Sequence, residues 1–212
     1  MCDKQPAKPM PPPRPLPQIG GFSLPHSELY RDVRRLLAQM ELALTAAEQR
    51  SAVMKAAGDV EKAAIALADF DAQMYSRAVQ VFAAMAAEAA LNTYGLMWFG
   101  ENDFKEHFER KAPTTKLKAL VRAVLARELT KNDEIVRLLD SIAKKRNAHV
   151  HLHAEESRFD ASGVHRPVTT GCQPIRHPYA GRETAAELNR FLELFSALDS
   201  RTANFFVVVV TV

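Results

Sequence analysis

Two long stretches of helical periodicity, separated by Gly58 and Asp59, constrain the fold of this chain more than any other feature. Apolar side chains recur every three to four residues after Ser27, a favoured N-cap residue, as far as about Ala57. The second stretch follows Asp59 and ends near Gly100. Glycine is a typical helix stop and aspartate a typical helix start. We therefore predict two long antiparallel helices.

Shorter helices are expected after Gly100. Asn102 is the predicted cap of a short helix that Pro113 ends, and the next helix starts at Thr114 or Thr115 and reaches Leu125. Asn, Thr and Pro in these positions are typical of helix boundaries.

Two further helices are predicted in the C-terminal half. Asp133 should begin one that reaches the region of residue 150, and the last helix is predicted over 184–204. Residues 154–181 are rich in Pro, Gly, Ser and Thr, which indicates a loop or a covering flap. The β-favouring run Phe-Phe-Val-Val-Val-Val at 205–210 should pack against the bundle or a second subunit, with a short C-terminal strand as one form.

The first 25 residues hold eight of the twelve prolines, which neither a helix nor a sheet tolerates. We expect a disordered, Pro-rich tail over 1–25 that acts as a linker. The remainder, 26–212, is predicted as one all-α domain, a helical bundle of about five or six helices with its core in 27–153. Because 47% of the residues are hydrophobic and only 8 are glycine, the chain has enough apolar side chains and few enough helix breakers to form a helical core.

Targeting and redox features favour a cytoplasmic protein without a membrane segment. The most apolar stretch, 78–97, contains Glu88 and Asn92, so a soluble helix is the better interpretation. The N-terminus lacks the pattern of a signal peptide. The two cysteines, Cys2 and Cys172, cannot form a disulfide framework and are expected to be reduced.

Basic residues are concentrated between Lys105 and Arg146. This segment holds twelve lysines and arginines against six acids, whereas the whole chain has a net charge of only +3. Such a segment suits a polyanionic partner, and a solvated helix face is the alternative.

The basic segment leads into Arg146-Asn147-Ala148-His149-Val150-His151, the most informative chemical motif of the chain. Arginine stays protonated at any working pH, whereas histidine exchanges a proton near neutrality. A fixed cation beside a proton shuttle is the minimum equipment for cleaving an RNA phosphodiester without a metal.

Arg-Asn-x-x-x-His late in a helix, preceded by an antiparallel helical pair, resembles the HEPN superfamily of small α-helical domains. Its signature is Arg, a polar residue and then His; Arg146, Asn147 and His151 match the form with four intervening positions, and His153 matches the form with six. Glu88 and Asn92 resemble the acidic and amide positions of the family's earlier long helix. The likeness covers about 27–151.

The resemblance implies a metal-independent endoribonuclease that acts as a homodimer and leaves a 2′,3′-cyclic phosphate. His151 would be the general acid or base, Arg146 would stabilise the charged transition state, and Asn147 would orient His151 or the phosphate. His149, His153, Glu88 and Asn92 are auxiliary candidates, and Lys144 and Lys145 are candidates for RNA binding. No cofactor or metal is implied. The toxin of a toxin–antitoxin or defence system, held by an antitoxin protein, is a role that fits.

Helix geometry complicates this site. At 100° per residue, His151 lies about 140° from Arg146, whereas Asn147 and His151 share a face. Either the helix end deforms, or Arg146 of one subunit meets His151 of the other. His149 or His153 could also substitute for His151.

Each chemical interpretation has a structural alternative. His149, His151 and His153 could bind a metal from a strand, but no Cys or carboxylate cluster completes the set. Lys144 and Lys145 could simply complement the helix dipole, and Glu88 and Asn92 could form a structural pair. The alternative function is a catalytically inactive, HEPN-like module that binds a partner or a nucleotide.

Overall fold

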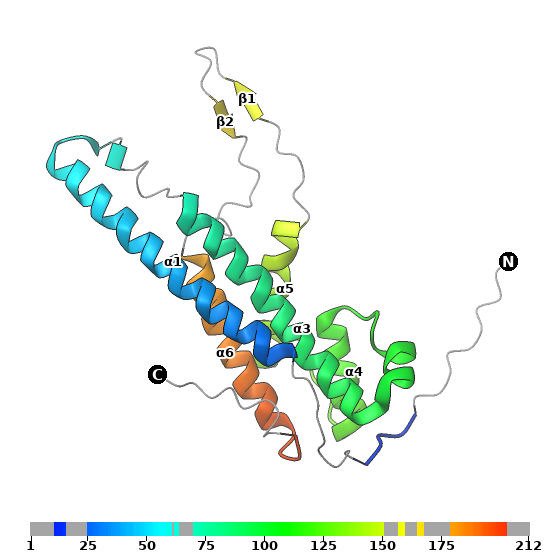
Figure 1. Cartoon of the computed structure of the whole chain (residues 1–212). Coiled ribbons are helices and arrows are strands. Elements are labelled where there is room, and N and C mark those ends of the chain that lie inside the picture. The colour runs from blue at the N-terminus through cyan, green and yellow to red at the C-terminus, as the bar shows by residue number, and fades with distance from the viewer. Residues whose placement is uncertain are drawn as a thin grey trace.

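The computed structural model describes residues 11–15, 25–60, 62–63, 70–150, 157–159, 165–167 and 179–202. Four long helices run alternately up and down the molecule, and a shorter one completes the bundle (Figure 1). This is the all-α helical bundle with antiparallel long helices that the sequence predicts. The predicted strand at 205–210, both cysteines and most of the Pro-rich tail lie outside the described residues.

The first two long helices form the expected antiparallel pair. Helix α1 spans Pro25–Ala56 and α3 spans Phe70–His107. Gly58 has φ of +81°, so the predicted helix stop is present there. Helix α3 is kinked at Gly100, where φ is 73° and ψ is 176°, and the predicted short helix after Asn102 is its continuation beyond this kink.

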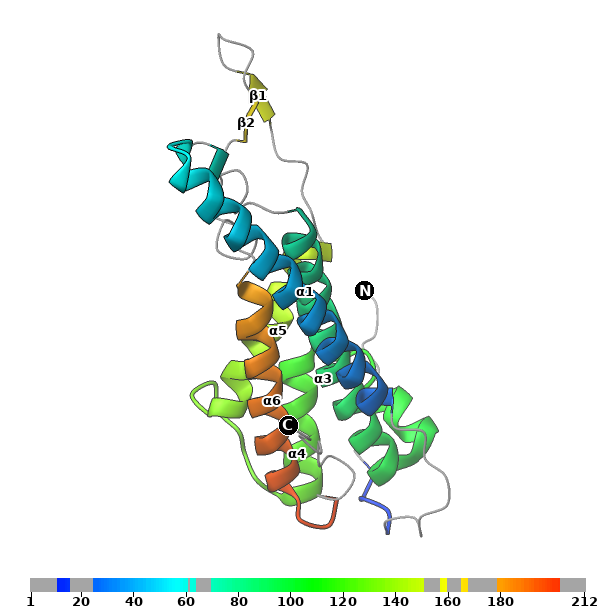
Figure 2. The ribbon, with the colours of Figure 1, turned by 60° about the vertical axis from the view of Figure 1, so that its left-hand side comes forward.

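The remaining helices surround α3. Helix α4 covers Pro113–Leu125, α5 covers Glu134–Val150 and α6 covers Ala180–Leu198. Pro113, predicted to end a helix, also opens the next one in the first turn, where its missing N–H costs nothing. Helix α3 contacts α1, α4, α5 and α6 and is therefore the central element (Figures 1 and 2).

The C-terminal half differs from the prediction at two helix boundaries and in one loop. Helix α6 begins four residues before the predicted start at Thr184, because the tightly packed Gly181 already belongs to its first turn. It ends at Leu198 rather than at 204, because the next residue, Asp199, is extended. The predicted loop also contains a short antiparallel pair, β1 (Ser157–Phe159) and β2 (His165–Pro167).

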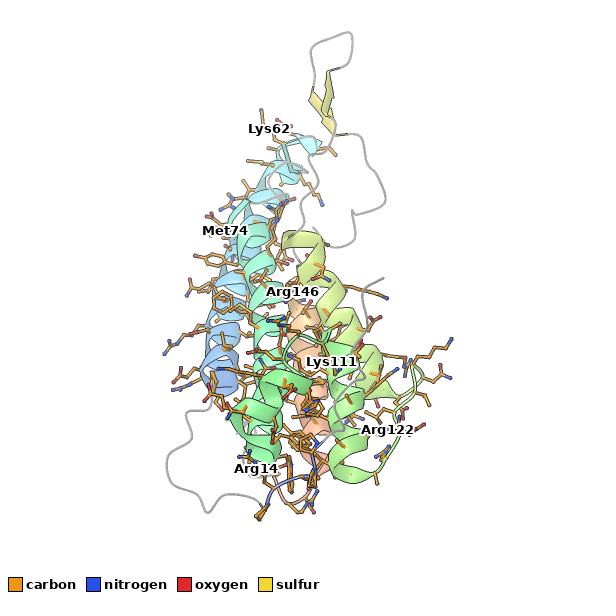
Figure 3. The ribbon with its side chains drawn as sticks, turned by 90° about the vertical axis from the view of Figure 1, so that its right-hand side faces the viewer. Arg14, Lys62, Met74, Lys111, Arg122 and Arg146 are labelled. Carbon is orange, nitrogen blue, oxygen red and sulfur yellow. The ribbon has the colours of Figure 1, made fainter. Side chains whose placement is uncertain are left out.

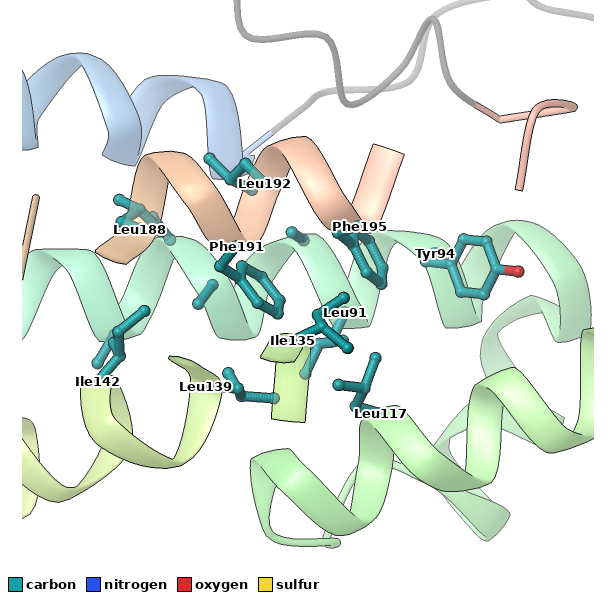
Figure 4. Packing of buried hydrophobic residues seen from close by; sticks show 14 of the residues in the cluster. Leu91, Tyr94, Leu117, Ile135, Leu139, Ile142, Leu188, Phe191, Leu192 and Phe195 are labelled. Atoms are coloured by element: carbon teal, nitrogen blue, oxygen red, sulfur yellow. The ribbon is translucent and has the colours of Figure 1, made fainter. Parts of the chain in front are cut away.

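The core lies where α3, α4, α5 and α6 meet (Figure 4). Each large side chain buried here contributes roughly 1.5–3 kcal/mol relative to an exposed position. Fully buried members include Leu91, Leu117, Leu139, Ile142, Leu188 and Phe191.

Two large apolar residues that recur at helical spacing in the second long stretch, and are therefore expected in the core, are exposed. Met74 and Met85 lie on the surface of α3. The reason is that the alanines on the opposite faces of α3, such as Ala83, Ala86 and Ala90, already fill the contacts with the neighbouring helices. Small residues let helices approach closely, so the larger methionines are left outside.

Candidate functional site

The Arg-Asn motif lies near the C-terminal end of α5 and faces α3. The Arg146 guanidinium donates from Nη1 to Glu88 Oε2 at 3.4 Å, and from Nε and Nη2 to Asn147 Oδ1 at 3.2 and 3.0 Å. Glu88 projects from the middle of α3, so two helices that are far apart in sequence supply the two partners. The ion pair is half-exposed, with side-chain exposures of 31% for Glu88 and 30% for Arg146. Figure 3 shows Arg146 among the helices of this side.

A second cation reaches the same carboxylate from below the surface. Lys116 of α4 is fully buried, and its Nζ donates to Asn92 Oδ1 at 2.7 Å and to Glu88 Oε1 at 3.3 Å. The ammonium also lies 5.8 Å from the ring centroid of Phe104, within cation–π range. Burying an ammonium costs free energy unless the group is paired, and the bonds to Asn92 and Glu88 offset this cost for Lys116.

These five residues are called the Glu88 cluster: Glu88, Asn92, Lys116, Arg146 and Asn147. Each cation takes one oxygen of Glu88 and one oxygen of an asparagine amide. One carboxylate thus faces two cations, and the cluster carries one formal positive charge in excess. An excess positive charge at a half-exposed position is suited to an anion.

The cluster borders a shallow hollow in the surface. Its lining comes from α3, α4 and α5 and includes Ala84, Glu88, Pro113, Leu139, Ile142, Ala143 and Arg146. The hollow encloses no space the size of a water molecule, so a ligand would lie on it rather than inside it. Helix α4 begins at this hollow with Pro113 and has neither a side-chain cap nor an acid in its first turn. Its N-terminal dipole therefore adds to the positive potential.

The two lysines before the motif have different environments. Lys144 is exposed and pairs with Asp140 one turn earlier, at 2.6 Å. Lys145 bonds Glu187 of α6 at 3.0 Å, and Ser141 donates to the same carboxylate at 2.9 Å. Lys145 therefore links α5 to α6, whereas Lys144 remains accessible to a polyanion.

The histidines of the motif lie at the limit of the described chain. His149 belongs to the last turn of α5, and His151 and His153 lie outside the described residues. The structure therefore brings together Arg146, Asn147, Glu88 and Asn92 of the predicted site. Within the described ranges, no three His, Cys, Asp or Glu side chains gather in a way that could hold a metal ion.

Lys116 is the member of the cluster that the sequence analysis did not assign to the site. One signal could have found it. Lys116 lies four residues before Leu120 and next to Leu117, so helical spacing places it on the buried face of α4. A lysine on an apolar face needs a buried acceptor, and Glu88 and Asn92 were available candidates.

A second polar cluster lies further along α3, towards the kink at Gly100, and is called the Asp199 cluster: Tyr94, Trp98, Asp199 and Arg201. Arg201 donates from Nε and Nη2 to the two oxygens of Asp199 at 2.7 and 3.0 Å, and the Tyr94 hydroxyl donates to Asp199 Oδ2 at 3.0 Å. The Arg201 guanidinium lies 4.3 Å from the ring centroid of Trp98. Charge is balanced here, since one carboxylate meets one guanidinium.

Burial and hydrogen bonding act in opposite directions on Asp199. Burial is the largest influence and by itself raises the pKa of the carboxyl, but hydrogen bonds from Arg201 and Tyr94 together bring the pKa below its ordinary value. Burial, followed by the negative charge of Asp199, raises the pKa of the Tyr94 hydroxyl. Tyr94 therefore stays protonated and acts as a donor.

Comparisons with known proteins identify no relative of this chain. No family model, no curated protein and no solved structure matches this chain. Along the described ranges, none of the helices combines the length and the apolarity that crossing a membrane requires. The Glu88 cluster and the Arg-Asn motif are therefore the features of this chain that bear on its function.

Proposed function

We propose that this protein is a metal-independent endoribonuclease of the HEPN type, which acts as a homodimer. The observation that carries the proposal is the convergence of Arg146 and Asn147 with Glu88 at the surface of the bundle, directly above the buried Lys116. Two cations that share one carboxylate leave positive charge for a phosphate. The geometry and the chemistry of the site therefore agree with the resemblance of the motif.

In the proposed reaction, Arg146 neutralises the additional negative charge that develops on the phosphorus oxygens during attack by the 2′-OH. Asn147 orients the scissile phosphate or His151 through its amide. His151 takes the proton from the 2′-OH or gives one to the leaving 5′-oxygen, a role that suits an imidazole with an ordinary pKa of about 6.5. The 2′-OH displaces the 5′-oxygen, which yields a 2′,3′-cyclic phosphate and a 5′-hydroxyl.

The surface of α3 supports the homodimer. Met74, Met85 and Leu96 are exposed and recur at intervals of eleven residues, which corresponds to slightly more than three whole turns. They therefore form one apolar stripe along the helix, called the Met85 stripe. Glu88 and Asn92 lie on the same side, three residues after Met85 and four before Leu96. A second copy on this stripe would bury it and bring its own motif to the same place.

The dimer can be tested by substitution on the stripe. We expect Met85→Glu to convert a dimer into a monomer in sedimentation analysis, because a buried unpaired carboxylate opposes association. The matched control is Leu42→Glu, which introduces the same charge at an exposed leucine of α1. A wild-type protein that is monomeric at all concentrations would rule out a catalytic site shared between two subunits.

The catalytic role can be tested with RNA in the presence of EDTA. We expect His151→Ala to abolish cleavage without loss of the fold, because the proton shuttle is removed. His107→Ala is the control, since His107 lies outside the motif near the end of α3. Retained cleavage by His151→Ala in the metal-free assay would reject this assignment.

One observation favours a second candidate function, an inactive interaction or nucleotide-binding module. The Arg146 guanidinium is engaged by Glu88 and by Asn147, its own neighbour. An arginine held in this way could serve only to dock α5 on α3. Calorimetry with a panel of nucleotides, together with the absence of cyclic-phosphate ends, would favour this alternative.

A toxin or defence role and an antitoxin partner belong to the same proposal. They follow from the resemblance, since a ribonuclease of this kind requires restraint in its own cell. Growth arrest on expression of the wild-type chain, relieved by His151→Ala, is the expected result.

A further inference from the structure

The kink of α3 creates an unusual acceptor on the helix surface. Gly100, with φ of 73° and ψ of 176°, interrupts the run of backbone hydrogen bonds. In an unbroken helix the carbonyl of Trp98 would accept from the amide of Asn102. At the kink it accepts from the backbone amide of Arg14, at 2.8 Å. The Pro-rich N-terminal segment thus donates a backbone hydrogen bond to the helix where its regular geometry is interrupted.

The side chain of Arg14 makes a second and a third contact at the same place. Its guanidinium donates from Nη2 to Asp103 Oδ2 at 3.2 Å. Nη1 lies where a side chain at position 100 would begin, because a Cβ added to Gly100 would collide with it. Gly100 therefore has two functions: it adopts the left-handed conformation, and it leaves room for the guanidinium.

The prolines on either side of Arg14 fix how the segment can bind. Proline has no N–H, so Arg14 is the only residue of Pro11–Pro15 that can donate a backbone hydrogen bond. The register of the segment on the kink is therefore unique. Prolines also hold the chain extended before it binds, which lowers the entropic cost of docking.

We propose that the α3 kink is a binding site for a single arginine within an extended, proline-flanked segment, and that Pro11–Pro15 of the same chain is its ligand. The site consists of the Trp98 carbonyl, the open face of Gly100 and the Asp103 carboxylate. Nine residues connect Pro15 to Pro25, where α1 begins, so the segment docks within one chain. A tether this short gives an effective concentration of order millimolar, which suffices for a weak site.

Hydrogen exchange at the Arg14 amide measures this docking directly. We expect the amide to be protected in the wild-type chain, and the protection to be independent of protein concentration. Asp103→Ala should reduce the protection by about twofold to fivefold, the range of a half-exposed ion pair. Glu101→Ala is the matched control. It removes a carboxylate of the same turn that pairs with Lys105 at 2.6 Å, whereas Arg14 pairs with Asp103.

A peptide experiment tests whether the kink recognises the arginine itself. The probe is a labelled peptide of residues 11–17, added to the full chain that carries Arg14→Ala. We expect binding in the millimolar range by fluorescence anisotropy, and none by the same peptide with alanine in place of its arginine. Gly100→Ala, checked for folding by circular dichroism, should also prevent peptide binding.

Three results would overturn the proposal. The first is an Arg14 amide that exchanges as fast as in the free peptide. The second is equal loss of protection in Asp103→Ala and Glu101→Ala. The third is protection that rises with protein concentration, which would identify the segment of a second copy as the occupant. None of these measurements depends on ribonuclease activity.

Discussion

The Glu88 cluster and the Asp199 cluster both contact α3, but they differ in exposure and in charge balance. Asp199 is 3% exposed, and one guanidinium and one hydroxyl occupy its oxygens. Glu88 is ten times more exposed, and two cations share it at longer distances of 3.3 and 3.4 Å. The Asp199 cluster is neutral and saturated, whereas the Glu88 cluster is positive and open to solvent.

This difference separates a structural role from a role in binding. A buried carboxylate with matched donors stabilises the end of α6 and gains nothing from a ligand. A half-exposed carboxylate between two cations can be joined or displaced by an anion, because the cations already exceed it in charge.

The largest effect is expected from Arg146→Ala. It should reduce RNA cleavage by about 100-fold to 1,000-fold, the range for removing a group that stabilises a transition-state oxyanion. Its free energy of unfolding should change by less than about 1 kcal/mol, because the Glu88 pair is partly solvated. Single-turnover kinetics and urea unfolding of the same preparation measure both quantities. A loss of stability without a loss of cleavage would show that Arg146 has a structural role and no role in catalysis.

Arg201→Ala should show the opposite pattern. It removes the bidentate partner of a buried carboxylate and the contact with Trp98, and we expect a loss of about 2–3 kcal/mol in the free energy of unfolding. Cleavage per folded molecule should not change. Arg190→Ala is the control, because this arginine also comes from the C-terminal region but pairs with exposed Glu134 on the surface. An Arg201→Ala protein as stable as Arg190→Ala would contradict the structural role.

Lys116→Met tests the source of the excess charge. The methionine keeps most of the packing of the lysine stem but removes the ammonium, so Asn92 loses its donor while Glu88 keeps Arg146. We expect a loss of about 1–2 kcal/mol in stability and weaker RNA binding at low salt. Lys118→Met, two residues along α4, controls for the change in net charge. Equal effects of the two substitutions on RNA binding would show that only the net charge matters.

The smallest effect is a pH dependence in the Asp199 cluster. Because the pKa of Asp199 is lower in the folded state, its contribution to stability is present above the unfolded pKa of about 4 and is lost as the pH falls through the folded value. The stability difference between wild type and Asp199→Asn should therefore be constant above about pH 5 and shrink at lower pH. Denaturant unfolding between pH 2 and 7 measures it, and a difference that grows on acidification would contradict the assigned sign.

Much of the fold follows from local sequence signals. Helical spacing predicts the long helices, and Gly58 marks the end of the first one. The start of α4 was predicted at Thr114 or Thr115, and the helix begins at Pro113. The continuation of α3 past Gly100 was harder to predict, because a glycine with positive φ usually marks the end of a helix. Here the helix resumes at once.

Long-range pairing is the part that the sequence could not supply. Tyr94 and Asp199 are 105 residues apart, and no local pattern connects them. The Glu88 cluster was partly accessible, since the motif pointed to Arg146 and Asn147 and the polar interruption of an apolar helix pointed to Glu88 and Asn92. The exposure of Met85 could not be predicted, because periodicity identifies an apolar stripe but not the neighbouring element that covers it.

The most direct test is an assay for 2′,3′-cyclic phosphate ends on RNA incubated in EDTA with wild type, Arg146→Ala and Arg201→Ala. We predict such ends with the wild type and with Arg201→Ala, at rates corrected for the folded fraction, and almost none with Arg146→Ala. Equal yields from Arg146→Ala and the wild type, or no cyclic ends from any of the three, would contradict the account.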